Sequence, residues 1–310
     1  DNENRLMDEF GEYDDWIEIY NHNPFPVNLA GLYLSDSLPH PNKYRIPSND
    51  LENTIVPAKE YVIIWTDGDN DQGPLHTNFK LSRSGEDLVL SAYDYHQIID
   101  SLSFQKQYSN FSSARLNDYG PWIDLPPTPG RSNLMPDLSH LYINEIMTMN
   151  MGVIADNHGE YDDWIEFYNG GTEAIDIGGL FITDSIGDTK PFRISSDQPD
   201  STTIQAMQFL LIWADDSTEQ GVLHSDFKLS RSGEQVAIYS YDGRAIIDSV
   251  SYKLVPRSCT FGRSSDGDLP WAEMGIPTPL EYNMLTGSNE INHDVLNFGY
   301  EIYTRHLIKY

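Results

Sequence analysis

The clearest pattern of apolar and polar positions is the run Trp16-Ile17-Glu18-Ile19-Tyr20. Its side chains alternate between the two sides of an extended chain, with the period of two that is typical of a half-buried β-strand. The eleven residues 11–21 that contain this run occur again at 159–169, 148 positions later, with one substitution. Because self-similarity at a fixed offset marks a repeated folding unit, we expect two copies of one domain.

The other apolar runs are short, are separated by residues that favour turns, and recur at the same offset. Tyr61–Trp65 is the most β-prone segment and predicts a central strand, with its copy at Phe209–Trp213. Residues 79–90 predict a β-hairpin whose turn contains Gly85. No segment has the 3.6-residue period of a long amphipathic helix. The patterns therefore predict an all-β chain of two tandem β-sandwich or barrel domains.

The positions of the copies also predict domain boundaries. The expected parts are a first domain at 1–133, a linker at 134–140, a second domain at 141–283, and an extension or the start of a further domain at 284–310. The second copy begins with an apolar strand, Tyr142–Met147, whose register in the first copy falls ahead of Asp1. The first sandwich is therefore expected to lack its opening strand and to expose an open edge.

One segment of the chain could cover such an edge. Residues 298–309 alternate in a mostly amphipathic pattern, so this run could pair with the edge within the chain or between chains, which would be strand-mediated self-association. The favoured alternative is that residues 288–310 begin a third domain.

Composition narrows the choice of partners. The formal net charge is −29, and an acidic surface repels phosphate backbones and anionic lipids, so nucleic acid is not expected as a partner. No apolar run is long enough to be a transmembrane segment, and the single cysteine, Cys259, excludes an internal disulfide. A chain rich in Tyr, Asn, Asp and Gly suits a secreted, periplasmic or cell-surface β-protein.

The repeated motifs resemble the lamin tail domain, an immunoglobulin-like β-sandwich found in nuclear lamins and in many bacterial secreted or surface proteins. The matching motifs are Asp-Trp-Ile-Glu-Ile/Phe-Tyr-Asn, the Gly-Leu corners at Gly31 and Gly179, Leu-His-Thr/Ser-x-Phe-Lys-Leu-Ser-Arg-Ser-Gly-Glu from Leu75 and Leu223, and a closing Pro-Thr-Pro. The resemblance covers residues 8–133 and 141–283. It implies two tandem immunoglobulin-like domains with an interaction or anchoring role and no catalytic residues.

The residues themselves give no sign of an active site. The sequence contains no nucleophile elbow, no Gly-rich phosphate loop and no His-Glu-x-x-His motif. Asp14 and Asp15 are neighbours, as are Asp162 and Asp163, and neighbours on an extended chain point to opposite faces, which does not suit a glycosidase pair. We therefore expect that the chain is not an enzyme.

Two sets of residues are candidates for binding. Asp67, Asp69 and Asp71 carry carboxylates at alternate positions, as at the start of an EF-hand-like calcium loop, although the loop's glycine and final glutamate are missing. A solvated acidic loop is the alternative. Trp122 and Trp271 lie in Pro-rich closing segments and could contact a ligand such as a glycan, whereas the other tryptophans are expected in the cores.

Two histidines, His76 and His224, occupy equal positions in the two copies. With no second His or Cys near either of them in the sequence, both are expected to be hydrogen-bonded structural residues.

Taken together, the sequence predicts a non-catalytic binding or anchoring protein of secreted or cell-surface type, in contact with a protein, polysaccharide or envelope partner. The alternative is an accessory region of a larger secreted enzyme, such as a nuclease, a phosphatase or a spore-coat-type kinase, whose catalytic domain lies outside this chain. Calcium is the one candidate cofactor.

Overall fold

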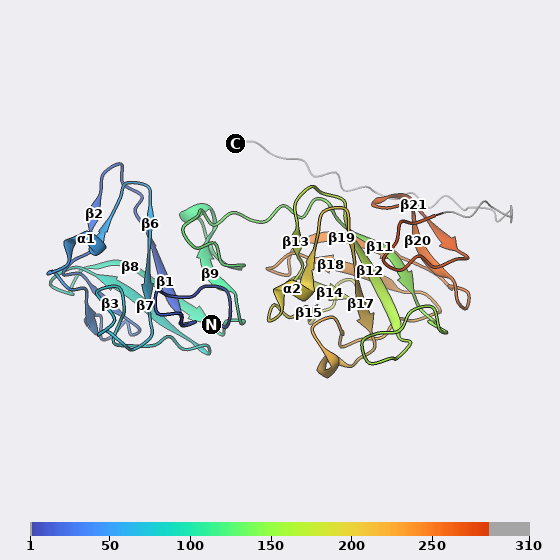
Figure 1. The fold of residues 1–310 in the computed structure, drawn as a ribbon, viewed down its shortest axis with the longest axis horizontal. Coiled ribbons are helices and arrows are strands. Elements are labelled where there is room, and N and C mark those ends of the chain that lie inside the picture. Colours follow the sequence, from blue (N-terminus) through green and yellow to red (C-terminus); the bar gives the residue numbers. More distant parts are fainter. Residues whose placement is uncertain (1, 285–310) are drawn as a thin grey trace.

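The computed structural model describes residues 2–284, so the alternating segment at 298–309 lies outside the described residues. The described chain forms two all-β units that follow one another along the long axis of the molecule (Figure 1). None of the helices in the described part of the chain is long and apolar enough to cross a membrane.

The first unit contains ten strands and two short helical turns. In chain order these are β1 (Trp16–Tyr20), β2 (Val27–Asn28), β3 (Tyr33–Ser35), β4 (Tyr44–Arg45), α1 (Leu51–Thr54), β5 (Ile55–Val56), β6 (Tyr61–Trp65), β7 (Gly85–Ser91), β8 (Ile98–Gln105), β9 (Ser112–Arg115), η1 (Leu116–Asp118) and β10 (Trp122–Leu125).

The second unit repeats the order of the strands and of the short α-helix, has its 3-10 turn at a different place, and adds one strand at its start. Its elements are β11 (Leu141–Met147), β12 (Asp163–Asn169), β13 (Ile175–Asp176), β14 (Phe181–Thr183), β15 (Phe192–Arg193), α2 (Pro199–Thr202), β16 (Thr203–Ile204), β17 (Phe209–Ala214), η2 (Thr218–Gln220), β18 (Gln235–Tyr239), β19 (Ile246–Ser251), β20 (Thr260–Ser265) and β21 (Asp268–Met274).

Sheet pairing confirms that the two units share one fold. The four-stranded sheets run β4-β3-β7-β8 and β15-β14-β18-β19, and the small ribbons β2-β5 and β13-β16 also correspond. The strands predicted from the repeat pair in the same register, with Trp16 opposite Trp65 and Trp164 opposite Trp213. The fold is therefore a tandem pair of immunoglobulin-like β-sandwiches, as the sequence predicted.

The second sheet is where the two units differ. In the second unit five strands are continuous in the order β17-β12-β11-β20-β21, with β11 in the centre. In the first unit the corresponding strands form two separate pairs, β1-β6 and β9-β10. No strand of residues 2–284 lies between β1 and β9. The positions that would correspond to β11, 148 residues earlier, fall ahead of Asp1.

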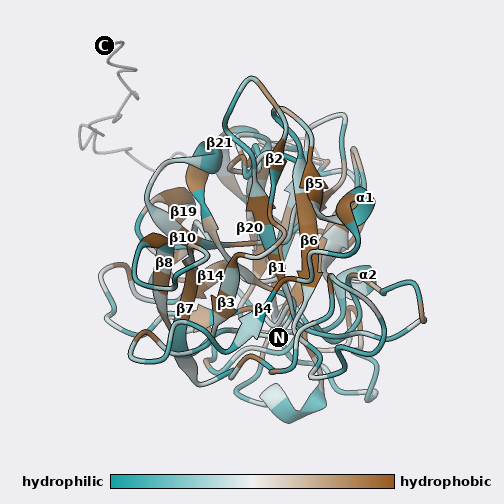
Figure 2. Cartoon of the chain, turned by 90° about the vertical axis from the view of Figure 1, so that its left-hand side faces the viewer, coloured by the Kyte–Doolittle hydropathy of each residue, from teal (hydrophilic) through white to brown (hydrophobic). Residues whose placement is uncertain are grey.

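Apolar side chains form a core in each unit, and Figure 2 shows mostly hydrophobic strands within a rim of hydrophilic loops. The effect of β11 is visible in the tryptophans. Trp164 is fully buried and packs with Met147 of β11 and with Trp213, whereas Trp16 is only half-buried. The expectation of core tryptophans is thus confirmed for Trp164, Trp213 and Trp65 and is met only in part by Trp16.

The first unit also contributes to the core of the second. Phe111 is 4% exposed and belongs to the same apolar cluster as Ile177 and Leu180. Its ring lies directly on the backbone of Gly179, and the guanidinium carbon of Arg193 lies 4.5 Å from the ring centre. A hydrogen bond from the Ser196 hydroxyl to the carbonyl of Ser109, at 2.7 Å, runs beside it. The two units are therefore packed against each other.

Candidate functional site

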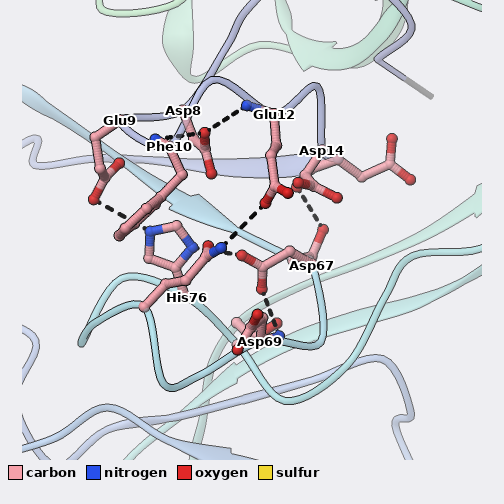
Figure 3. Close-up of polar contacts among 12 residues, drawn as sticks. Asp8, Glu9, Phe10, Glu12, Asp14, Asp67, Asp69 and His76 are labelled. Atoms are coloured by element: carbon pink, nitrogen blue, oxygen red, sulfur yellow. Dashed lines mark hydrogen bonds and ion pairs between the residues drawn. The ribbon is translucent and has the colours of Figure 1, made fainter.

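An acidic cluster lies where the loop ahead of β1 meets the loop after β6 (Figure 3). In the first loop, Asp8 Oδ1 accepts hydrogen bonds from the backbone N–H groups of Phe10 and Glu12, both at 2.8 Å. The second loop follows Trp65, the last residue of β6, and folds back so that His76 forms a parallel β-bridge with Trp65. Two segments that are far apart in the sequence are therefore held face to face.

A buried His–Asp pair forms one side of this cluster. His76 is 1% exposed and Asp67 6% exposed, and His76 Nδ1 is hydrogen-bonded to Asp67 Oδ2 while Nε2 lies 3.3 Å from Glu9 Oε1. Burial alone would lower the pKa of His76, but the hydrogen bonds to the two carboxylates outweigh it and raise the pKa. The expectation of a hydrogen-bonded histidine is confirmed.

The second domain repeats the arrangement 148 positions later. Asp156 Oδ1 accepts hydrogen bonds from the N–H groups of His158 and Glu160, both at 2.8 Å. His224 is also buried, and its Nδ1 lies 2.5 Å from Asp215 Oδ2. The geometry is therefore a property of the repeated unit and is present in both domains.

Three carboxylates crowd together in each cluster, with potential ligand atoms within 4.8 Å of one another: Asp8, Glu12 and Asp14 in the first domain, and Asp156, Glu160 and Asp162 in the second. Atoms of Asp67 and His76 lie within the same distance of Asp8. Partial burial raises the pKa of Asp14, and neighbouring carboxylates raise it further against the opposing charge of Lys80. The cluster therefore holds more negative charge than its own contacts balance.

Of the three aspartates that the sequence suggested as calcium ligands, only Asp67 lies in this cluster. Asp69 and Asp71 are exposed and belong to no group of potential metal ligands in residues 2–284. The N–H of Asp69 donates to Asp67 Oδ1 at 3.0 Å, so this residue shapes the loop. Metal ligation by the set Asp67, Asp69 and Asp71 stays a prediction. Sequence reasoning missed Asp8, Glu12 and Asp14 because they come from a different loop.

A second candidate is an open cleft of about 600 Å³ in the first domain. It lies between β1 and the β9-β10 hairpin, where the second domain holds β11. Apolar side chains such as Leu34, Leu88 and Phe104 line it, together with Asn2 and Trp122 at its rim. The open edge expected from the sequence is therefore the wall of a cavity.

The second domain shows what such a cleft can hold. There β11 pairs with β12 along its length and with β20 at Glu145 and Ile146. Ile143, Ile146 and Met147 of β11 are fully buried. The Asn144 side chain donates to Glu166 Oε1 at 3.0 Å. The same amide donates to Asp266 Oδ1 at 2.9 Å, so the strand is held by backbone pairing, apolar burial and side-chain hydrogen bonds.

An Arg–Asp pair grips the backbone of this strand. Asp248 Oδ2 accepts from the N–H of Ile143, and Arg263 Nε donates to the carbonyl of the same residue, both at 2.8 Å. Arg263 and Asp248 are themselves paired at 2.8 Å. In the first domain Arg115 and Asp100 occupy the corresponding positions and are also paired at 2.8 Å. The first domain therefore has the same Arg–Asp pair, although no strand of residues 2–284 lies against it.

The carboxylate that meets the strand is also in place. Glu18 Oε1 accepts a hydrogen bond from the N–H of Gly130 at 2.7 Å, just as Glu166 Oε2 does from the N–H of Leu280 at 2.6 Å. Burial raises the pKa of Glu18. The first domain therefore keeps the groups that receive a strand in the second.

The two tryptophans suggested as ligand contacts differ in position. Trp122 is 38% exposed at the rim of the cleft, with the guanidinium carbon of Arg115 4.5 Å from its ring centre. Trp271 is half-buried and stacks on Phe261, with ring centres 5.4 Å apart. A role of Trp122 and Trp271 in ligand contact stays a prediction.

Fold and repeat together define a tandem, immunoglobulin-like, all-β protein. The sequence model of the Lamin Tail Domain family matches residues 3–106 and 136–254, and the chain belongs to this family. Lamin tail domains are a family of immunoglobulin-like domains of a non-catalytic, protein-interaction type. No curated protein and no solved structure matches the chain.

Proposed function

We propose that the chain is a non-catalytic binding module of a secreted or cell-surface protein, and that its first domain holds a partner protein by accepting a β-strand. The observation that supports this proposal is the cleft between β1 and β9, whose receiving groups match those around β11. The acidic, thiol-poor composition supports the extracellular placement. Fractionation of producing cells, with the chain probed in medium, envelope and cytoplasm, tests that placement.

Strand addition is favoured because an edge strand presents a row of backbone N–H and C=O groups. A partner segment placed on β1 gains these hydrogen bonds, and pockets for alternate side chains select its sequence. The segment that fits is extended, with aliphatic residues at the positions of Ile143 and Ile146 and an asparagine at that of Asn144. The asparagine amide would then donate to Glu18.

A protein strand explains the cleft better than a polysaccharide does. The cleft is lined mainly by apolar side chains, and its exposed tryptophan, Trp122, already has the Arg115 guanidinium over its ring. A glycan that stacks on Trp122 would have to displace that cation. The apolar lining instead matches the four fully buried apolar side chains that β11 places in the second domain: Leu141, Ile143, Ile146 and Met147.

The test uses a fluorescent peptide with the sequence of residues 139–149, titrated with the 310-residue chain. We expect saturable binding with a dissociation constant on the order of micromolar. A peptide with Ile143→Lys and Ile146→Lys is the matched control and should not bind. Arg115→Gln in the protein should weaken binding about tenfold or more, because it removes a charged hydrogen-bond donor to the strand backbone. Absence of binding by the native peptide refutes the proposal.

The same peptide also tests whether the strand comes from a partner. A segment ahead of Asp1 in a longer protein could fill the cleft. In that case the peptide binds this chain but does not bind the longer protein. The strand would then complete the fold of the first domain, and the cleft would not recruit a partner protein. The accessory-region alternative predicts hydrolase or kinase activity in the longer protein that this chain does not have. Assays on both proteins decide between the two roles.

A further inference from the structure

We propose that each domain binds one calcium ion at its acidic cluster, so that the chain holds two calcium ions at equivalent positions. The first site is formed by Asp8, Glu12 and Asp14, completed by Asp67 and Gln72. The second is formed by the residues 148 positions later. This inference is independent of the strand cleft.

Buried oxygens without a hydrogen-bond partner lie in both clusters. They are Asp8 Oδ2 and Gln72 Oε1 in the first domain, and Asp156 Oδ2, Asp162 Oδ2 and Gln220 Oε1 in the second. Asp8 is only 9% exposed. Burying a charged oxygen without a donor is strongly unfavourable unless a cation compensates it. Because the same atoms of Asp8 and Gln72 recur in the second copy, the pattern points to a positively charged ligand.

The local structure holds the side chains that carry these oxygens close to the cluster. Two backbone N–H groups fix Asp8 Oδ1, which leaves Oδ2 facing the cluster. Gln72 Nε2 donates to Glu12 Oε2 at 3.1 Å, as Gln220 Nε2 donates to Glu160 Oε2 at 2.8 Å, so each amide is held beside a carboxylate. Figure 3 shows the carboxylates of Asp8, Glu12 and Asp67 turned toward a common space.

The donor set favours calcium over other divalent ions. Carboxylate and amide oxygens are hard ligands, and calcium accepts six to eight of them in irregular geometry, whereas magnesium needs a near-ideal octahedron. Zinc prefers nitrogen and sulfur ligands. The histidine nitrogens already have oxygen partners: His76 contacts Asp67 and Glu9, and His224 contacts Asp215 and Asn157. The histidine therefore positions Asp67 and is not a ligand.

The lysine beside the cluster does not neutralise its carboxylates in place of a calcium ion. Lys80 Nζ lies 3.9 Å from Asp14 Oδ1, and its side chain is 70% exposed, so it screens the edge of the cluster only weakly. A calcium ion would join the loop ahead of β1 to the loop after β6. Binding should therefore stabilise the paired strands that these loops flank.

The experiment removes metal from the 310-residue chain with EDTA and titrates calcium chloride by calorimetry. We expect two sites with dissociation constants on the order of 0.1 mM or tighter, and a rise of about 5 °C in the melting temperature at saturation. Asp8→Asn should remove one site and Asp156→Asn the other. Each substitution keeps Oδ1 as the acceptor of the two loop hydrogen bonds. Asp69→Asn, at an exposed position outside the cluster, is the matched control and should keep both sites.

Three results would overturn the proposal. The first is the absence of both calorimetric heat and a melting shift with calcium. The second is two intact sites in the Asp8→Asn, Asp156→Asn double variant, which would place the ions elsewhere. The third is binding of zinc but not calcium, abolished by His76→Gln and His224→Gln. If a variant fails to fold by circular dichroism, Glu12→Gln and Glu160→Gln replace it with the same expected loss of sites.

Discussion

The contact of Phe111 with Gly179 leads to a prediction that has its own control within the chain. Gly179 has φ of +88°, and its counterpart Gly31 has φ of +85°, so alanine strains the backbone equally at both positions. A Cβ at Gly179 would lie 2.0 Å from Phe111 Cζ, whereas one at Gly31 would meet nothing closer than Tyr93 Cδ1 at 3.3 Å. The two substitutions therefore differ in whether they expel an aromatic ring from the contact between the domains.

The expected magnitudes follow from this geometry. The left-handed conformation costs an alanine about 1–2 kcal/mol at either site. Expelling the Phe111 ring adds a part of the 3–5 kcal/mol that truncating a buried phenylalanine costs, so we expect about 2–4 kcal/mol more for Gly179→Ala. At about 4 °C per kcal/mol, Gly31→Ala should lower its domain's melting temperature by about 4–8 °C, and Gly179→Ala by at least about 12 °C.

Scanning calorimetry of both variants measures these shifts, and a double-mutant cycle identifies the cause. In a Phe111→Ala background, Gly179→Ala should cost no more than Gly31→Ala, because no ring remains to be displaced. Equal losses for the two glycine variants in the native background, or a coupling energy near zero, would refute the role of Phe111 as a stabilising contact between the domains.

Two further predictions concern charge. Burial, with Glu145 and Asp266 adding negative charge, raises the pKa of Glu166 from 4.5 to about 8, so the folded domain keeps a proton that the unfolded chain releases above pH 4.5. This contribution, at most about 5 kcal/mol, is complete below pH 4.5 and is lost as pH rises through 8, so calorimetry should show the second domain melting lower at pH 8 than at pH 5. Glu166→Gln should flatten that slope, and an unchanged slope would contradict the assignment. With a net charge of −29, the chain should not shift duplex DNA in a gel at low salt, and tight binding there would contradict the electrostatic argument.

The fold was largely predictable because its signals are local. Period-two alternation at Trp16–Tyr20 and the apolar run at Tyr61–Trp65 each identify a strand, and their repetition identifies the domain. The contact between the domains gave no such signal. Phe111 corresponds to Cys259 in the second copy, so the repeat does not mark it. Its importance depends on tertiary packing against Gly179, which no pattern within either segment contains.

The open cleft was predictable in part. A strand register that falls ahead of Asp1 indicates an open edge in the first copy, but it does not show whether the edge collapses. The structure keeps Arg115 and Asp100 paired and keeps Glu18 bonded to Gly130, so the groups that would receive a strand remain in position. Trp16 is half-buried, whereas its counterpart Trp164 is fully buried. The difference indicates that a strand in the cleft would cover apolar surface of Trp16.

The acidic cluster could have been found by comparing the copies position by position. Asp8, Glu12, Asp14, Gln72 and His76 are identical to the residues 148 positions later. Their neighbours change: position 69 is Asp in one copy and Ser in the other, and position 71 is Asp in one and Glu in the other. In the structure the carboxylates and the histidine among these identical residues belong to groups of potential metal ligands, whereas Asp69 and Asp71 belong to no such group within residues 2–284. The alternating aspartates indicated the loop after Trp65, which does contribute to the cluster. Identity between the two copies is the better signal, because it selects the residues whose side chains form the cluster and leaves out those that only add negative charge to the loop.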